Sequence, residues 1–235
     1  FITVSMVCVT GLSVFAVGDV YNGWGQVVCM LLMQIGGLGL VTLISLSYYA
    51  LKQKMSLKQQ SLLQSAIIYD TADQLKDYLF LIFKVTFAVE GIAVSLLMID
   101  FIPRFGLGHG IFNSIFLAVS AFCNAGFDNF GSTSLASFKL NPLVNLVISF
   151  LIIAGGLGFG VWKDLLAAGR KLLTKGPKTS KTFSRALSNH SRLVLQTTGL
   201  LLVGGTVLSW VLELGNPKTI GQLNVFQQGL VSFFQ

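Results

Sequence analysis

The chain has 235 residues, of which 53% are apolar and only 11% are charged, whereas a soluble globular protein carries about 25% charged residues. This composition, with a mean hydropathy of +0.75, argues against a soluble protein and indicates a membrane protein. The net charge of +7 suggests nucleic-acid binding only weakly, because the basic residues follow apolar blocks, and the three scattered cysteines form neither a disulfide framework nor a zinc motif.

Long apolar blocks predict four membrane-spanning helices. A helix needs roughly 20 residues to cross a hydrocarbon core ~30 Å thick. Blocks of this kind lie at 26–51, 78–102, 143–162 and 193–212. The second block is interrupted by Lys84 and Glu90, and an acid within a membrane span is a candidate functional residue. We expect Glu90 to bond a neighbouring helix, with an ion relay as the alternative, and Lys84 to reach toward the cytoplasm.

Three shorter apolar runs are predicted to be re-entrant or buried helices. They are the run ending at Val7, the run 111–122 and the run 225–234. Basic residues gather in the connections 52–76 and 163–192, which places both connections in the cytoplasm by the positive-inside rule. The run 111–122 must then enter and leave the membrane on the outer side. A nucleic-acid role for residues 170–192 is the weaker interpretation of the same charges.

The chain contains an internal repeat. VSMVCVTGL at 4–12 returns as VSAFCNAGF at 119–127, and QIGGLGL at 34–40 returns as IAGGLGF at 153–159. Each unit is therefore predicted as an outward helix, a short re-entrant helix, a glycine-bearing turn and an inward helix. A third unit starts near Arg192, with two registers open: Ser232 matches either Ser114 or Ser120.

The repeat divides the sequence into five parts. They are the end of repeat one (1–51), a cytoplasmic linker (52–77), a complete repeat two (78–162), a basic cytoplasmic linker (163–192) and the start of repeat three (193–235), which we expect to be truncated before its glycine turn. The expected fold is an all-α, polytopic membrane protein of helix–pore loop–helix units around a central pore.

The recurring glycine indicates an ion site. Irregular backbone at membrane depth is tolerated only where it is buried in protein or lines a wet cavity. Carbonyl oxygens in such a turn can replace the hydration shell of a cation, as in K⁺ filters. Aligning successive carbonyls needs backbone angles that favour glycine, which Gly11 and Gly126 supply.

The two Gly-Gly-Leu-Gly sequences at 36–39 and 155–158 need a separate interpretation. A dinucleotide-binding loop would require a strand before it and a soluble helix after it. We instead expect both sequences to lie within spanning helices, where small residues allow close packing and leave room for a neighbouring pore helix.

The motifs VCVTGL, CNAGFDNFG and the paired QIGGLG and AGGLGF segments resemble the Ktr/Trk/HKT superfamily of K⁺ transporters, and most closely the bacterial KtrB/TrkH-type membrane subunit. The resemblance implies four such repeats in one chain around a single pore. It also implies two filter strands whose backbone carbonyls bind K⁺, formed by Val9, Thr10 and Gly11 and by Asn124, Ala125 and Gly126. Glycine at position 11 rather than serine favours K⁺ over Na⁺ within this superfamily.

The same resemblance implies the biological setting. The protein is expected to be a multi-pass subunit of a bacterial plasma membrane that takes up K⁺ down its electrochemical gradient. It is expected to need no cofactor, to form a homodimer and to bind a cytosolic nucleotide-binding regulatory subunit of the KtrA/TrkA type. Segment 163–192 is either a contact for that subunit or a plain positive-inside loop. Dependence on Na⁺ stays open.

Other interpretations remain. Asp128 either concentrates cations at the pore mouth or caps the turn after the second filter strand. A secondary transporter of another solute is one alternative, although such folds often contain inverted repeats and these repeats run parallel. A non-transporting scaffold or an intramembrane enzyme is another, although the sequence offers no paired nucleophile and base.

Overall fold

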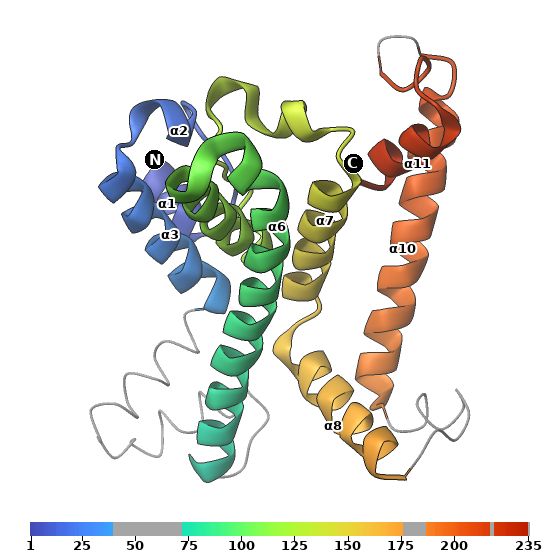
Figure 1. Ribbon diagram of the computed structural model, residues 1–235. Coiled ribbons are helices and arrows are strands. Elements are labelled where there is room, and N and C mark those ends of the chain that lie inside the picture. Colours follow the sequence, from blue (N-terminus) through green and yellow to red (C-terminus); the bar gives the residue numbers. More distant parts are fainter. Residues whose placement is uncertain (40–71, 176–186, 217–218, 235) are drawn as a thin grey trace. The chain divides into compact units, whose positions relative to one another are not determined.

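The computed structural model describes residues 1–39, 72–175, 187–216 and 219–234, and every extended regular element within these ranges is a helix. The described chain forms two compact units, Phe1–Ser134 and Leu135–Gln235, which are treated separately below. Figure 1 labels the elements of both units.

The described part of the first unit contains four α-helices. They are α1 (Ile2–Val7), α2 (Val17–Val20), α3 (Gly23–Leu38) and α6 (Ala72–Phe122). Helix α3 packs against both α1 and α6. Asn22 caps the start of α3, because its side-chain oxygen accepts the backbone N–H of Gly25 at 2.8 Å; this satisfies one of the free donors of the first turn.

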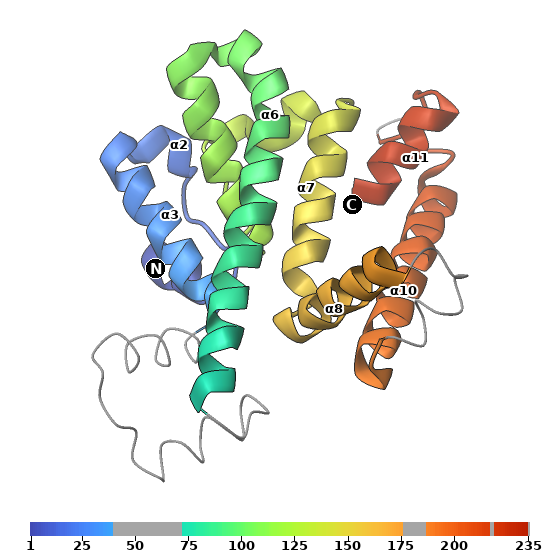
Figure 2. The ribbon, with the colours of Figure 1, turned by 60° about the horizontal axis from the view of Figure 1, so that its bottom comes forward.

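Helix α6 consists of two helical segments that are separated by a break. Its backbone leaves the helical region at Gly106, where φ is 77° and ψ is 170°. The chain doubles back there, as Figure 2 shows for the green part of α6. A Cβ atom on Gly110 would lie 2.8 Å from the Cα atom of Ile102, so glycine permits the returning helix to approach the helix it has just left. The segment after Gly106 is the short helix predicted around 111–122.

The core of the first unit surrounds the two recurring motifs. Buried apolar side chains from α1, α2, α3, the returning part of α6 and the segment after it form one cluster: Ile2, Met6, Val17, Cys29, Met33, Phe116, Cys123, Ala125 and Phe127. Burial of such side chains contributes about 25 cal/mol per Å² of apolar surface removed from water. Segments more than one hundred residues apart in the sequence are thereby held together.

The second unit begins at Leu135, within the 3₁₀ helix η1 (Gly131–Phe138). Its described α-helices are α7 (Pro142–Gly156), α8 (Phe159–Lys175), α10 (Asn189–Glu213) and α11 (Val225–Phe234). Helix α10 contacts both α8 and α11, and α11 also contacts α7. The indole N–H of Trp210 donates to Gln228 Oε1 at 3.0 Å and so ties α10 to α11.

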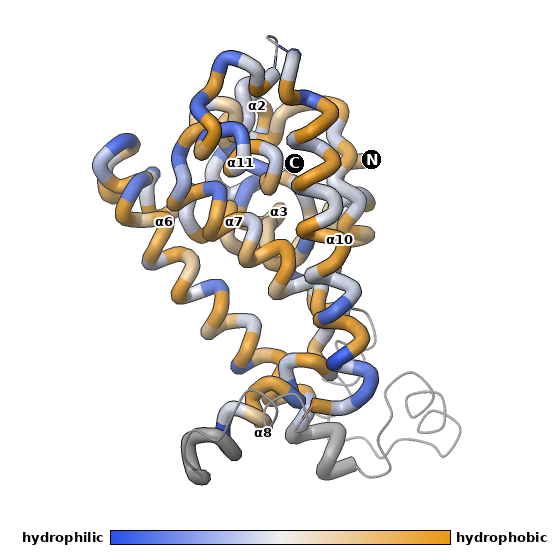
Figure 3. The backbone as a smooth tube through the Cα atoms, turned by 90° about the vertical axis from the view of Figure 1, so that its right-hand side faces the viewer, coloured by the Kyte–Doolittle hydropathy of each residue, from blue (hydrophilic) through white to orange (hydrophobic). Residues whose placement is uncertain are grey.

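Two helices in the described ranges are long and apolar enough to cross a membrane, Tyr78–Phe122 and Asn189–Glu213, with a third if η1 and α7 count as one span. None of the residues in the most apolar part of α10 is buried, and Figure 3 shows that apolar residues predominate along this helix. An exposed apolar surface of this length suits lipid rather than water. The fold is that of an all-α membrane protein, as the sequence predicts.

The predicted positions of the Gly-Gly-Leu-Gly sequences within continuous helices are wrong. Helix α3 ends at Leu38 and is followed by Gly39 with φ 82°, and α7 ends at Gly156, before Gly158 with φ 81°. Glycine enters this left-handed region without a steric cost, and it commonly terminates helices for that reason. The apolar block 143–162 is therefore divided between α7 and α8, and the part of block 26–51 beyond Gly39 lies outside the described residues.

The start of α11 helps to decide whether Ser232 in the third repeat corresponds to Ser114 or to Ser120. Helix α11 begins at Val225, 118 positions after Leu107, the first residue beyond the Gly106 break. This spacing agrees with the match between Ser114 and Ser232 rather than that between Ser120 and Ser232.

Candidate functional site: two glycine turns

Residues 9–11 and 124–126, here called the glycine turns, have the same backbone conformation. Val9 and Asn124 have φ values of 55° and 56°, and both Gly11 and Gly126 have a φ of 72°. Positive φ is uncommon for any residue other than glycine, and for a β-branched residue such as valine it is a genuine outlier. The same pair of angles 115 positions apart shows that the sequence repeat is also a structural repeat.

The hydrogen bonds of the two turns repeat as well. The backbone N–H of Thr10 donates to the carbonyl of Ser5 at 2.9 Å, and that of Ala125 donates to the carbonyl of Ser120 at 2.8 Å. In a trans peptide the N–H and the C=O point in opposite directions. The carbonyls of Val9 and Asn124 therefore point away from the short helices that precede them.

The fold brings the two glycines side by side. A Cβ atom on Gly11 would lie 3.2 Å from the carbonyl oxygen of Ala125, and a Cβ atom on Gly126 would lie 3.4 Å from the Cα atom of Gly11. The predicted site residues thus form one cluster in the first unit. Asn124 and Gly126 are exposed within this cluster, whereas Ala125 is buried.

The first Gly-Gly-Leu-Gly sequence, at the end of α3, packs closely against the residues just before both glycine turns. A Cβ atom on Gly36 would lie 2.3 Å from the carbonyl oxygen of Val7, and one on Gly37 would lie 2.4 Å from Cys123 Sγ. Neither position has space for a side chain unless backbone or a buried cysteine shifts. For the first sequence this agrees with the expectation that its glycines leave room for a neighbouring short helix, because the end of α3 contacts residues at the ends of two of them. In the second sequence, a Cβ atom on Gly158 would meet no described atom within 4 Å.

Glu90 is buried near the same place. Its side chain is 5% exposed and interacts with the side chain of Gln34 on α3, a neighbouring helix, as the sequence analysis expects. Cys123 Sγ lies 3.9 Å from Oε1 of Gln34 and interacts electrostatically with Glu90. Glu90 therefore faces the polar surroundings at the end of the second short helix, as expected of an acid inside a membrane protein, while Lys84 is exposed.

The loop after the second glycine turn holds Asp128 in place. One carboxylate oxygen of Asp128 accepts the backbone N–H of Phe130 at 3.0 Å, and the other accepts the hydroxyl of Ser134. This is the capping geometry that the sequence suggested as one of two roles. An effect of its charge on cations at the pore mouth stays a prediction.

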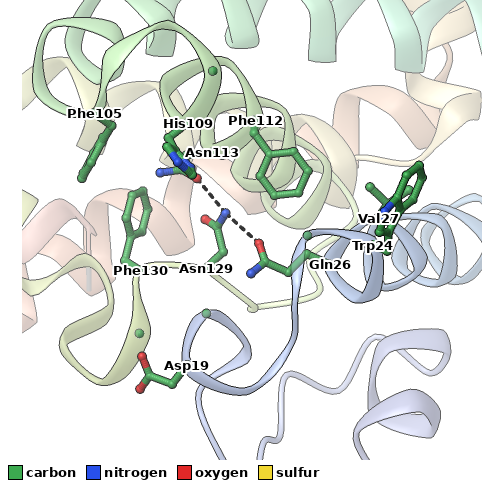
Figure 4. A pocket seen from close by; sticks show the side chains of 14 residues that line it. Asp19, Trp24, Gln26, Val27, Phe105, His109, Phe112, Asn113, Asn129 and Phe130 are labelled. Carbon is green, nitrogen blue, oxygen red and sulfur yellow. Dashed lines mark hydrogen bonds between the residues drawn. The ribbon is translucent and has the colours of Figure 1, made fainter.

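An open pocket of about 960 Å³ lies beside this loop. Figure 4 shows Asn129 between two other amide side chains. Its nitrogen donates to Gln26 Oε1 at 3.2 Å and to Asn113 Oδ1 at 2.8 Å. Gln26 belongs to α3 and Asn113 to the returning part of α6, so this network joins both repeats next to the second turn. These amides are not evident from the sequence, because no spacing along the chain relates them.

Ser5 and Ser120, which have no predicted role, contact the glycine turns through their hydroxyls. Ser5 Oγ accepts the backbone N–H of Leu12 at 2.9 Å, and Ser120 Oγ accepts that of Phe127 at 2.9 Å. The signal is present in the sequence, since both serines occupy the second position of the repeated motif.

These features define a class: an all-α membrane protein in which two short helices, each followed by a glycine turn, bring the two turns together. The chain belongs to the TrkH family, described as cation transport proteins, whose match covers residues 1–235. This is a family of transporters, not of enzymes.

Three curated relatives are each 37% identical to the chain. They are the potassium/sodium uptake protein NtpJ of Enterococcus hirae, which matches 91% of this chain and 44% of its own length, and the Ktr system potassium uptake proteins B of Bacillus subtilis and Vibrio alginolyticus, which match 100% of this chain and 50% and 49% of their own lengths. The chain thus spans about half the length of the curated relatives that it matches.

Proposed function

We propose that this chain is part of a K⁺ uptake subunit in which the backbone carbonyls of the two glycine turns form half of a selectivity filter. The observation that carries the proposal is the contact between Gly11 and Gly126, two residues with the same left-handed backbone and 115 positions apart. Carbonyls that point away from their own short helices are available to replace water around a monovalent cation.

The proposed residues have specific roles. Carbonyl oxygens of the glycine turns bind the ion: those of Val9, Thr10, Gly11, Asn124, Ala125 and Gly126. Glycine makes the left-handed backbone accessible at the last position of each turn. The short helices direct the partial negative charge of their C-terminal ends toward the turns, which favours a cation. No covalent step is involved, and the transported ion is the substrate.

We also propose the setting implied by the family. The protein is a multi-pass subunit of the bacterial plasma membrane, it forms a homodimer, and it binds a cytosolic nucleotide-binding regulatory subunit of the KtrA/TrkA type. The names of the relatives from Bacillus subtilis and Vibrio alginolyticus refer to a Ktr system, which supports further subunits. The basic segment 163–192 is a cytoplasmic loop in this proposal, with a contact for the regulatory subunit as the alternative role of the same charges.

Na⁺ uptake is the second candidate, because one relative at 37% identity is named as a potassium/sodium uptake protein. Glycine rather than serine at position 11 favours K⁺. Na⁺ acting as a coupling ion is compatible with either candidate.

The test is uptake of ⁸⁶Rb⁺, a K⁺ substitute, and of ²²Na⁺ by cells that lack their own K⁺ transporters and express the full-length protein. We expect saturable Rb⁺ uptake that excess K⁺ suppresses and excess Na⁺ does not. Uptake of Na⁺ that K⁺ does not suppress would support the second candidate. No uptake of either ion above that of cells carrying an empty vector would reject both candidates.

A further inference from the structure

The residue after each glycine turn donates a hydrogen bond to a buried serine side chain, and the function proposed above gives this hydrogen bond no role. The N–H groups of Leu12 and Phe127, the residues directly after the two glycines, donate to the hydroxyls of Ser5 and Ser120. Both distances are 2.9 Å, and the serine side chains are only 4% and 1% exposed. The two contacts have the same length, although the contact of Phe127 is buried and that of Leu12 is only partly buried. A contact that returns with the same partners at the same spacing is a part of the repeat.

The contact determines the direction of one particular carbonyl. The N–H of Leu12 and the carbonyl of Gly11 belong to the same planar trans peptide, so they point in opposite directions. When the N–H points at Ser5 on the short helix, the glycine carbonyl points away from that helix. Two residues earlier, the backbone carbonyl of Ser5 orients the carbonyl of Val9 in the same way, by accepting the N–H of Thr10.

The N–H groups of Leu12 and Phe127 need a side-chain acceptor because the short helix has already ended before them. The serine backbone carbonyl is already occupied by the N–H of the residue before the glycine, and no helical turn follows directly in either described motif. The hydrogen bond of the Phe127 N–H is buried, and a buried peptide N–H without a partner is costly. Without the Ser120 hydroxyl, the peptide that joins Gly126 to Phe127 would therefore gain by rotating toward another acceptor. Glycine has little resistance to such a rotation.

We propose that Ser5 and Ser120 are positioning residues for ion selectivity, which hold the Gly11 and Gly126 carbonyls toward the ion path by accepting the next N–H. This inference rests on the proposed function of the glycine turns. The two serines differ in two respects. The Ser5 hydroxyl also shares a hydrogen bond of 2.7 Å with the Thr10 hydroxyl, whereas the residue equivalent to Thr10 in the second turn is Ala125. The contact of Ser120 is also buried, whereas that of Ser5 is partly buried. Ser120 is therefore the cleaner position for substitution.

The experiment compares Ser120 variants of the full-length protein by Rb⁺ uptake, by its inhibition with Na⁺ and by protein level in the membrane. Ser120→Ala removes the acceptor. Ser120→Cys keeps nearly the same volume with a sulfur that accepts poorly, and Ser120→Thr keeps the hydroxyl. We expect the ratio of Rb⁺ to Na⁺ affinity to fall at least about tenfold in the alanine and cysteine variants and to return toward that of the unmodified protein in the threonine variant.

Ser114→Ala is the matched control. Ser114 lies on the same short helix and is fully buried, but its hydroxyl donates to the carbonyl of Gly110 at 2.7 Å within the helix. We expect its selectivity to equal that of the unmodified protein. A general loss of helix packing would change both alanine variants alike, whereas an effect on the filter changes Ser120→Ala alone.

The possible failures can be distinguished. If the unmodified protein takes up no Rb⁺, the proposed function fails and this inference with it. If the unmodified protein discriminates between the ions and Ser120→Ala and Ser120→Cys discriminate equally well at normal membrane levels, the serine role alone is rejected. Equal losses in Ser120→Ala and Ser114→Ala would also reject it.

Discussion

At the scale of single residues, the two glycine turns store backbone strain. Val9 adopts φ 55°, a region that costs of order 1–3 kcal/mol for a residue that is not glycine. Asn124 occupies the same position in the second turn with φ 56°, and asparagine tolerates this region because its side chain can bond locally. The same strained conformation in both turns indicates that the surrounding contacts impose it, which is typical of functional sites.

Replacing the glycines tests whether this backbone matters for transport. Gly11→Ser and Gly126→Ser should each weaken the discrimination between Rb⁺ and Na⁺ or abolish uptake, because a side chain at φ 72° is strained. The loss should be greater for Gly11→Ser, whose Cβ atom would lie 3.2 Å from a backbone oxygen. Radioactive Rb⁺ uptake with and without competing Na⁺ measures both effects.

The control for these variants is Gly91→Ala. Gly91 lies inside α6, and a Cβ atom there would meet no other described residue within 4 Å, so uptake should not change. Unaltered uptake and selectivity in both serine variants would remove the glycine turns from the mechanism.

Single residues also differ in how far the sequence predicts their place in the site. The repeat identifies Gly11 and Gly126, because glycine has a recognisable conformational use. It does not identify a strained Val9, since nothing about valine indicates positive φ. Nor does it identify the amide network of Asn129, whose partners lie 103 and 16 positions away.

At the scale of helices, hydropathy predicts which segments are apolar but not where each helix ends. The breaks at Gly39 and Gly158 come from backbone angles, and a hydropathy pattern is insensitive to a single left-handed residue. A reversal near Gly106 follows from the sequence, because the second block and the short run are antiparallel and require a turn between them. The separate helix α8 does not follow from it, since its first residues extend the apolar block.

Helix α8 is joined to α10 by one carboxylate. Asp164 Oδ2 accepts the hydroxyls of Ser188 at 2.5 Å and Ser191 at 2.6 Å, and Ser188 also caps α10 by accepting the N–H of Ser191 at 3.2 Å. The hydrogen bonds from Ser188 and Ser191 lower the pKa of Asp164 below its ordinary value. A negative charge at the start of α10 is also favourable for the helix dipole.

This contact predicts a pH-dependent stability. A lowered pKa in the folded state means that the stabilisation is complete above the ordinary carboxyl pKa of about 4 and is lost as the pH falls through the lowered value. Asp164→Asn should decrease the stability of the full-length protein at pH 7 by up to ~1 kcal/mol, because solvent screens this partly exposed group.

Thermal unfolding in detergent at pH 7 and below pH 4 measures this difference. The matched control is Asp100→Asn, which changes an aspartate in the first unit whose ion pair with Arg104 lies within one helix. If Asp164→Asn destabilised the protein equally at both pH values, the ionised carboxylate would not be the source of the effect.

At the scale of the whole molecule, repeat symmetry builds the site. The same motif at 4–12 and 119–127 folds into the same turn, and the core of the first unit brings the two copies into contact. The sequence predicts this meeting, because re-entrant helices on the same side of the membrane must converge if they line one pore. Two turns supply only part of an ion's coordination shell, and the chain spans about half the length of the curated relatives that it matches.

The central claim is that backbone oxygens of the two glycine turns bind the transported ion. The most direct measurement is the anomalous diffraction of Rb⁺ in crystals of the full-length protein. We predict a Rb⁺ peak within coordination distance of the Gly11 and Gly126 carbonyl oxygens. A Rb⁺ site elsewhere in the protein, with the glycine turns free of the ion at concentrations that saturate uptake, would contradict this claim.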